Sequence, residues 1–512
     1  MFFLFSLKKS NAKTPKMMMI SPFFADDQPD SLKKSGADLS NYREQCLKER
    51  NARTLTLRRN SRTAITNILG VNSLNSAGKA HRRASFLDEL QGINLTIETI
   101  AEILESGSLQ RISDLCTQIV NVSSTSPQLL QKLFQDPSIA IPFVNCFTCG
   151  INESEMRLLI DAISSIFPIC NEDLRRSFID EGLLMNIYCF FESEYKPIIY
   201  SSLALVAIVS ISSSYARDSV LSLGILDSII QLAHSHEEDK PLTDAACATI
   251  EKIFSDGESD INCDTLDYYL DQIGSLLKLT SEGAVNSILL SLNSMMEKSP
   301  SLVMKMNQIG LYVNVVNYLK IPSFAGAAIK IVGNLCIGNP SDVHMMLECG
   351  LFQLLIGYLR TEYVADVLWD LSNLLEAMTK DVLPMLTDDL INAIVEITSM
   401  SSYLVKREGA VFLSTLILYT DSSVVPAFVN VDIIEILVEM LGCSVTSVIW
   451  RCINSLMKLS HNLQPDKLEL FIQMLFDADI VKMLNDLVEN NNTEIAEISR
   501  VMLNSLSHYS KC

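Results

Sequence analysis

Ile309-Gly310-Leu311-Tyr312 and, 40 residues later, Cys349-Gly350-Leu351-Phe352 are two copies of the pattern that decides the fold. In each copy a glycine is followed at once by apolar residues that open an amphipathic helix. Earlier copies stand at Glu181-Gly182-Leu183-Leu184 and Leu223-Gly224-Ile225-Leu226, and Thr265-Leu266-Asp267-Tyr268-Tyr269 fills the long interval before Gly310. The sequence therefore repeats with a period of about 42 residues.

Weaker copies of the same pattern extend the repeat in both directions. They lie at Asp136-Pro137-Ser138-Ile139, Leu390-Ile391, Asp432-Ile433 and Asp479-Ile480. A purely helical period of this length is typical of armadillo and HEAT repeats, in which each unit buries its apolar face against its neighbours. We predict an all-α fold, a right-handed superhelical armadillo-repeat solenoid of about ten repeats with a long concave groove, preceded by a basic N-terminal arm that is disordered or helical.

Composition supports long helices in a reducing compartment. Glycine and proline number only 19 and 15 in 512 residues, and 13 cysteines are scattered without a disulfide framework. No apolar run reaches the roughly 20 residues that span a bilayer, so no membrane association is expected. Met1-Phe2-Phe3-Leu4-Phe5 is too short for a signal peptide. It is either a disordered tail or precedes the true start, for which Met17–Met19 are candidates.

Charge divides the chain into a basic arm and an acidic body. Residues 1–85 carry 16 Lys and Arg against 6 Asp and Glu, whereas residues 86–512 carry 24 against 54. The acidic body repels nucleic acid and favours basic peptides, and the arm can fold back on the body or bind an acidic partner. The predicted divisions are a disordered tail (1–40), a basic segment (41–70), a flexible linker (71–89) and the solenoid (90–512).

Trp369 and Asn373 are the most informative pair of side chains. They are four residues apart, so on a helix they share one face. The Asn amide offers a donor and an acceptor to an extended peptide backbone, and the indole offers a flat wall to a Lys or Arg side chain. An ordinary buried tryptophan is the alternative. The chain has one other tryptophan, Trp450, which is also followed four residues later by an asparagine, Asn454.

These segments resemble the importin-alpha family. Ala328-Ile329-Lys330-Ile331-Val332-Gly333-Asn334 is similar to the third helix of that family's sixth repeat, and Val367-Leu368-Trp369-Asp370-Leu371-Ser372-Asn373 to that of the seventh. Leu266-Asp267-Tyr268-Tyr269-Leu270-Asp271-Gln272-Ile273 resembles the start of the fifth repeat. Leu57-Arg58-Arg59-Asn60-Ser61-Arg62 is similar to the family's importin-beta-binding segment, although the family's run of four arginines is absent. The resemblance implies a nuclear import adaptor of cytoplasm and nucleus, without a cofactor.

The resemblance also implies the residues of two partner sites. Nuclear-localisation peptides of cargo proteins would bind the family's minor cargo site, and an importin-beta-type receptor would bind the arm. The cargo-peptide residues carried over are Asn334, Gly338, Asp366, Trp369, Asn373 and Glu408. The receptor-binding residues carried over are Arg50, Arg53, Arg58, Arg59 and Arg62.

In the importin-alpha family, Trp/Asn pairs on successive third helices make two cargo sites, a major and a minor one, and elsewhere this chain departs from these pairs. At the major cargo site the pairs are replaced by Asp161 and Ser165, by Val206 and Ser210, and by Ala248 and Lys252; after the minor site, Val411 and Thr415 stand in their place. Trp450 and Asn454 are about one residue out of register, so both a core and a groove position stay open. The chain ends Ser507-His508-Tyr509-Ser510-Lys511-Cys512, without the family's acidic tail. The groove is therefore expected to keep its minor-site end and to lose most of its major one.

The sequence leaves one alternative function open. An armadillo scaffold in a cytoskeletal or signalling assembly, without import cargo, is the alternative function. No motif of a hydrolase, P-loop enzyme, zinc protease or dinucleotide-binding enzyme occurs, so no enzyme activity and no metal is expected. Cys146 and Cys149 are read as packing thiols, and His234 and His236 as part of a solvated loop. Arg82-Arg83-Ala84-Ser85 resembles a kinase acceptor site with Ser85 as the possible phosphosite.

Overall fold

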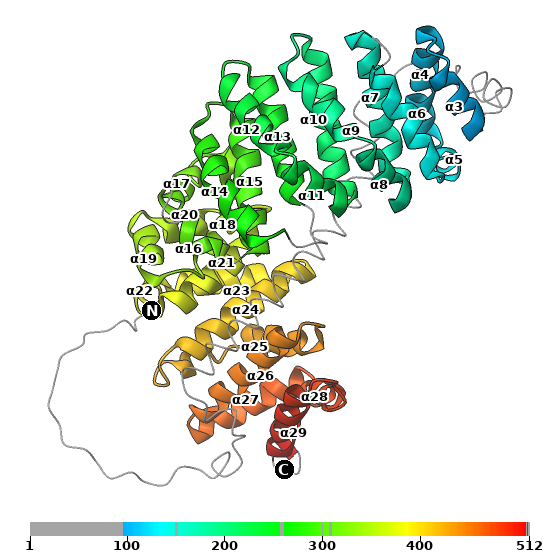
Figure 1. Cartoon of the computed structure of the whole chain (residues 1–512). Coiled ribbons are helices and arrows are strands. Elements are labelled where there is room, and N and C mark those ends of the chain that lie inside the picture. The colour runs from blue at the N-terminus through cyan, green and yellow to red at the C-terminus, as the bar shows by residue number, and fades with distance from the viewer. Residues whose placement is uncertain are drawn as a thin grey trace, which may run out of the picture. The chain divides into compact units, whose positions relative to one another are not determined.

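The computed structural model describes residues 96–148, 152–255, 261–299, 301–306, 310–507 and 509. Over these residues the chain consists of α-helices, short 3-10 helices and turns, with no strand (Figure 1). None of the described helices combines the length and the apolar character that crossing a bilayer requires. The predicted tail, arm and linker lie outside the described residues. So do Cys149, Ser85 and the five arginines assigned to the receptor.

The described chain forms two compact units, one ending at Asp388 and the other beginning at Asp389. The first unit contains these α-helices: α3 (Ile97–Glu105), α4 (Leu109–Thr125), α5 (Pro127–Leu133), α6 (Ala140–Asn145), α7 (Glu153–Ile166), α8 (Glu172–Asp180), α9 (Leu183–Tyr188), α10 (Lys196–Ser212), α11 (Ser214–Ser222), α12 (Ile225–Ser235), α13 (Lys240–Ser255), α14 (Cys263–Ser275), α15 (Glu282–Lys298), α16 (Leu302–Met306), α17 (Leu311–Tyr318), α18 (Pro322–Leu335), α19 (Pro340–Glu348), α20 (Leu351–Gly357), α21 (Val364–Ala377) and α22 (Thr379–Val382).

The second unit is shorter and continues the helical pattern. Its α-helices are α23 (Asp388–Met400), which begins at the boundary, α24 (Tyr403–Tyr419), α25 (Val431–Glu439), α26 (Thr446–His461), α27 (Pro465–Asp477), α28 (Ile480–Val488) and α29 (Thr493–Ser507). The 3-10 helices of both units are η2 (Pro137–Ile139), η3 (Cys146–Thr148), η4 (Phe167–Ile169), η5 (Cys189–Glu192), η6 (Leu276–Lys278), η7 (Leu383–Met385), η8 (Val425–Phe428) and η9 (Met440–Gly442).

The repeat is a three-helix unit, of which α11, α12 and α13 are a complete example. A short first helix turns sharply into a second, and a long third helix returns. The sharp turn needs a left-handed residue, which glycine adopts without steric cost. The second helix then begins directly after it, as the sequence pattern predicts. The glycines with positive φ at this turn are Gly182, Gly224, Gly310 and Gly350.

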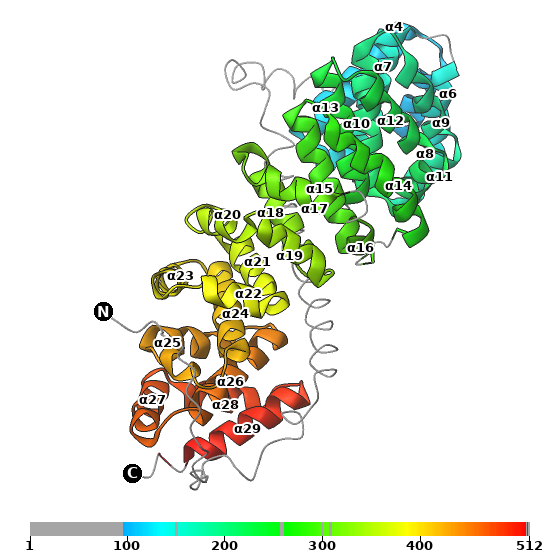
Figure 2. The same ribbon diagram turned by 90° about the vertical axis from the view of Figure 1, so that its left-hand side faces the viewer.

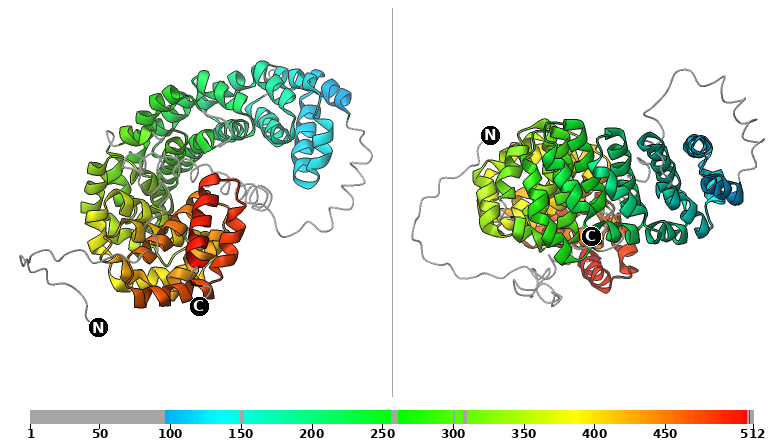
Figure 3. Two further views of the ribbon diagram at one scale, coloured as in Figure 1. Left: turned by 90° about the horizontal axis from the view of Figure 1, so that it is seen from below. Right: turned by 45° about the horizontal axis from the view of Figure 1, so that its top comes forward.

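The long third helices form a row through each unit. In the first unit α10, α13, α15, α18 and α21 follow one another as neighbours (Figures 2 and 3). Each third helix is buried on two sides, because it packs on its own repeat and on the next; ten residues of α18 are buried, including Ala325, Ile329 and Val332. The all-α armadillo-repeat solenoid predicted from the period is thereby confirmed.

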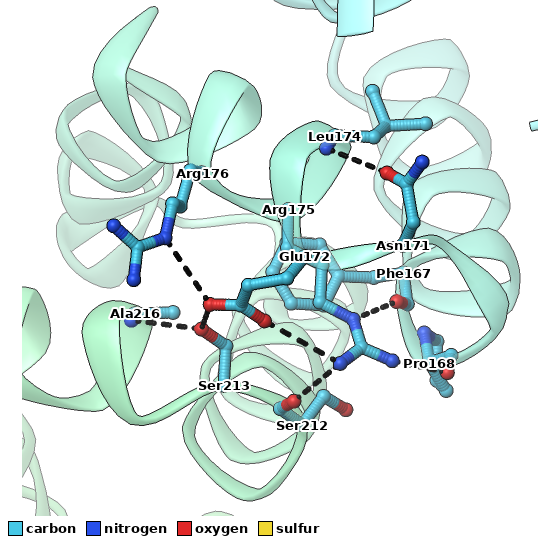
Figure 4. A network of polar contacts seen from close by, with 10 residues as sticks. All are labelled: Phe167, Pro168, Asn171, Glu172, Leu174, Arg175, Arg176, Ser212, Ser213 and Ala216. Atoms are coloured by element: carbon cyan, nitrogen blue, oxygen red, sulfur yellow. Dashed lines mark hydrogen bonds and ion pairs between the residues drawn. The ribbon is translucent and has the colours of Figure 1, made fainter. Parts of the chain in front are cut away.

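Side-chain hydrogen bonds, in addition to the apolar core, join consecutive repeats. Arg175 of α8 donates to Phe167 O at 3.1 Å and Pro168 O at 2.6 Å after α7, and to Ser212 O at 2.7 Å at the end of α10 (Figure 4). The guanidinium thus satisfies carbonyls at the C-terminal ends of two successive third helices, where the helix dipole favours a cation. Further along, the hydroxyl of Tyr358 donates across the repeat boundary to Leu319 O at 2.7 Å. These partners lie 37 and 39 residues apart, about one repeat.

Candidate peptide-binding site

Three asparagines occupy equivalent positions on the successive third helices α15, α18 and α21. We call Asn293, Asn334 and Asn373 the amide ladder. Asn334 Nδ2 donates to Asn293 Oδ1 at 3.0 Å, and Asn373 Nδ2 donates to Gly333 O at 3.0 Å. Asn293 Nδ2 in turn donates to Glu297 Oε1 at 2.9 Å. Each of the three asparagines is at most 5% exposed, so a peptide that binds their amides must replace some of these hydrogen bonds with bonds to its own backbone.

Hydroxyl groups take the ladder positions on the earlier helices and on α24. Ser165 Oγ donates to Asp161 O at 2.9 Å, Ser210 Oγ to Val206 O at 2.8 Å, and Thr415 Oγ1 to Val411 O at 2.8 Å. All three bonds return to the same helix, four residues back, as short hydroxyl side chains commonly do. The longer carboxamides of Asn334 and Asn373 reach the neighbouring helix. On α13 the equivalent residue is Lys252, which is exposed and whose Nζ lies 3.3 Å from Glu251 Oε1.

Trp369 lies across α18 at Gly333. A Cβ atom placed on Gly333 would come within 1.9 Å of Trp369 Cζ3 and 2.4 Å of Asp370 Oδ1. Only glycine lets the indole approach the α18 backbone this closely. The indole remains partly exposed, one turn before Asn373, and Asp366 is partly exposed in the first turn of α21.

The structure brings four of the six residues carried over for cargo together. Asn334, Asp366, Trp369 and Asn373 lie on the adjacent helices α18 and α21. Gly338 stands just beyond the end of α18, where a Cβ atom would meet Val303 Cγ1 at 2.9 Å.

Glu408, the sixth residue, belongs to the other compact unit. It is 6% exposed, and its Oε1 accepts from Arg407 Nε at 3.0 Å and Nη2 at 2.6 Å. Its carboxylate is therefore already engaged by a cation of its own helix.

The second tryptophan has a different environment. Trp450 Nε1 donates to Glu494 Oε1 of α29 at 3.2 Å, and Asn454 Nδ2 donates to Trp450 O at 2.8 Å. Ser455 Oγ donates to Ser414 O at 3.3 Å, which is the equivalent of the bond from Asn373 to Gly333. Ser455 therefore takes the ladder position on α26, and Trp450 and Asn454 are one residue off it.

Charge on the first unit strongly favours cations. Residues 86–388 contain 16 Lys and Arg and 39 Asp and Glu. On the third helices around the ladder, the partly exposed carboxylates are Glu297, Asp366 and Glu376. Amides that exchange their internal bonds, together with one indole and the carboxylates, can hold an extended backbone and Lys or Arg side chains.

Asn293 and Glu297 were not anticipated from the sequence. Asn293 stands 41 residues before Asn334, so the period was the signal that could have found it. The signal was hidden because the fifth repeat has neither the turn glycine nor a tryptophan.

The minor motifs have ordinary structural partners. The buried Cys146 lies with its Sγ 3.7 Å from Leu104 O, and His234 Nε2 lies 3.0 Å from Ser275 Oγ. Within the described ranges, no three His, Cys, Asp or Glu side chains gather in a way that could hold a metal ion.

Comparison with known proteins supports the fold. No protein-family model matches the chain, and no curated protein matches it. Solved structures do match: an engineered protein is similar over 80% of this chain and 98% of its own, at a TM-score of 0.60 and 14% identity. The chain is an armadillo-repeat solenoid. A designed armadillo repeat protein in complex with the peptide (KR)4 matches over 46% of this chain and 99% of its own, at a TM-score of 0.34 and 16% identity.

Proposed function

We propose that this armadillo protein is a non-enzymatic adaptor that binds extended basic peptides along the amide ladder. The observation that carries the proposal is the alignment of Asn293, Asn334 and Asn373 on three successive third helices, with Trp369 beside the last. Amides on helices about 8–10 Å apart can hold peptide groups two or three residues apart in one strand-like ligand.

The side chains of the ligand are selected by the indole and the carboxylates. The face of Trp369 suits the aliphatic stem and charged head of Lys or Arg. Asp366 stands one turn earlier on the same helix, where it can accept from the ammonium or guanidinium group. The acidic excess of residues 86–388 steers cations to this unit before contact.

We further propose that the cargo is a nuclear-localisation peptide and that the basic arm binds an importin-beta-type receptor. The charge contrast between residues 1–85 and 86–512 supports an arm that competes with cargo for the acidic body. Such a protein would pass between cytoplasm and nucleus.

The peptide proposal is tested by fluorescence anisotropy with a labelled Lys/Arg-rich peptide. Trp369→Ala with Asn373→Ala is expected to weaken binding about 10-fold or more, as loss of an aromatic anchor typically does. Trp450→Ala with Asn454→Ala is the matched control, because it removes the same pair of residue types from the other unit. If the Trp369→Ala, Asn373→Ala variant binds the peptide as tightly as the wild type, the proposed site is refuted.

Import is tested separately with the full chain. Arg58→Glu, Arg59→Glu and Arg62→Glu together should abolish capture by an immobilised importin-beta-type receptor while preserving or improving peptide binding. A scaffold role in a cytoskeletal or signalling assembly is the second candidate, favoured by the hydroxyls that replace amides on α7 and α10. Failure of the wild-type chain to bind the receptor, with peptide binding intact, would select that candidate.

A further inference from the structure

The third helix α13 carries a lysine, Lys252, at the ladder position. Helix α13 packs on α10, α12 and α15. Lys252, Ala248 and Asp244 are not buried and lie four positions apart, so they form one stripe along the helix. Asp244 extends over Gly283 of α15, where a Cβ atom would lie 2.8 Å from Asp244 Cγ. The stripe therefore continues onto the helix that carries Asn293.

Lys252 presents its charge to solvent. Its side chain is 46% exposed, whereas each ladder asparagine is at most 5% exposed. Its Nζ lies 3.3 Å from Oε1 of Glu251, whose own side chain is 16% exposed. An ammonium group has three N–H donors, so this ion pair leaves donors for a ligand. A peptide that continues along the ladder from α15 to α13 therefore meets a cation where the later helices offer amides.

We propose that Lys252 is a specificity-determining residue that binds a carboxylate of the peptide and so limits the basic part of the ligand. This inference rests on the peptide-binding function proposed above. A Lys or Arg of the ligand at this place would meet a like charge, which is unfavourable. A carboxylate there gains a charge-assisted hydrogen bond instead. The side chain of an Asp or Glu and the C-terminus of the peptide both supply this chemistry.

The arrangement of the helices sets the position of the carboxylate in the peptide. Helix α13 packs on α15, α15 on α18, and α18 on α21, so three steps separate Lys252 from Trp369. Packed helices are about 8–10 Å apart, and an extended chain advances about 3.3 Å per residue. The carboxylate therefore lies about seven to nine residues from the Lys or Arg that meets Trp369. The end of the peptide at which it lies gives the direction of the peptide along the ladder.

Anisotropy titrations with five peptides test the proposal. All share one labelled Lys/Arg-rich cluster, and a Gly/Ser spacer separates it from a single terminal residue about eight positions from the middle of the cluster. Four peptides have an amidated C-terminus and carry Glu or Gln at the N-terminal or the C-terminal end. The fifth carries Gln at the C-terminal end with a free carboxylate, which distinguishes the two sources of the charge.

Three full-length proteins are compared at low salt, where ion pairs are least screened. They are the wild type, Lys252→Gln, and Lys278→Gln on η6, an exposed lysine whose loss changes the net charge equally. Circular dichroism verifies that each variant is folded.

In the wild type and in Lys278→Gln, a peptide with the added carboxylate at one end is expected to bind about 2- to 5-fold more tightly than its amidated Gln partner, corresponding to one exposed ion pair. In Lys252→Gln this ratio should fall to about one. A ratio of one in the wild type, or the same ratio in all three proteins, would overturn the role of Lys252 and leave the binding function standing. Absence of binding of every peptide to the wild type would overturn the proposed function and this inference together.

Discussion

Replacing Gly333 with Ala probes the contact on which the tryptophan frame depends. The added Cβ atom would lie 1.9 Å from Trp369 Cζ3 and 2.3 Å from Cε3, where carbon atoms normally stay about 3.5–4.0 Å apart. The indole must therefore move by about 1.5–2 Å or α18 and α21 must separate. Overpacking of this kind costs about 1–3 kcal/mol, partly offset by the gain of about 1 kcal/mol that Ala has over Gly in a helix.

Gly357→Ala supplies the matched control. Gly357 closes α20, and a Cβ atom there would have no neighbour within 4 Å. This variant should be as stable as the wild type or slightly more stable. Relative to it, Gly333→Ala should lower the free energy of unfolding by about 1–3 kcal/mol.

The two tryptophans make the assay specific to one unit. Trp369 belongs to the unit that ends at Asp388 and Trp450 to the other. In a Trp450→Phe background, urea unfolding followed by indole fluorescence therefore reports on the first unit alone. The Gly333→Ala change can also be made in a Trp369→Ala background, with unfolding followed by circular dichroism. If it no longer lowers the free energy of unfolding relative to Trp369→Ala alone, the indole is the obstacle. Gly333→Ala as stable as Gly357→Ala would refute the packing of Trp369 on α18.

Three further outcomes are expected. Arg175→Ala should lower the free energy of unfolding by about 2–4 kcal/mol in urea titrations, because carbonyls of two repeats lose a charged donor. Arg176→Ala is the control: the Arg176 side chain is 55% exposed, so this variant should lose under about 1 kcal/mol. Burial raises the pKa of the Cys247 thiol to about 12, so the folded state keeps its proton while unfolded thiols ionise above about pH 8.5. The free energy of unfolding should therefore fall as pH rises from about 8.5 toward 12. Between pH 8.5 and 10, Cys247→Ala should make this fall less steep by up to about 1.4 kcal/mol per pH unit. An unchanged dependence on pH would contradict the burial of the thiol. Of the described cysteines, a thiol reagent should modify only the exposed ones rapidly in the native protein, as peptide mapping can check: Cys189, Cys263 and Cys349.

The features foreseen from the sequence are those with a local cause. Gly224 and Gly310 mark the turn before a helix because only their own backbone has to adopt a positive φ. The apolar faces repeat with the period because every third helix packs in the same way. The four-residue frame of Trp369 and Asn373 needs nothing more than a helix to place both on one face.

The features missed depend on partners in a neighbouring helix. A ladder residue can bond to its own helix or cross to the neighbouring one: Ser210 returns to Val206 O, Asn373 crosses to Gly333 O, and Ser455 does both. The sequence places Glu408 beside Arg407, yet only the structure shows the pair buried together. The boundary between the units at Asp388 leaves no mark, because the repeat period runs through it.

The hydrogen bonds between consecutive repeats have a consequence for folding during synthesis of the chain. Arg175 is synthesised 37 residues before Ser212, whose carbonyl it binds, and Tyr358 donates to a carbonyl that was synthesised 39 residues earlier. A wider hydrogen bond joins Thr249 Oγ1 to Leu203 O, 46 residues apart. At about 5–20 residues per second on the ribosome, every such partner emerges within roughly 10 seconds. A nascent repeat can therefore close on its predecessor long before the 512-residue chain is finished.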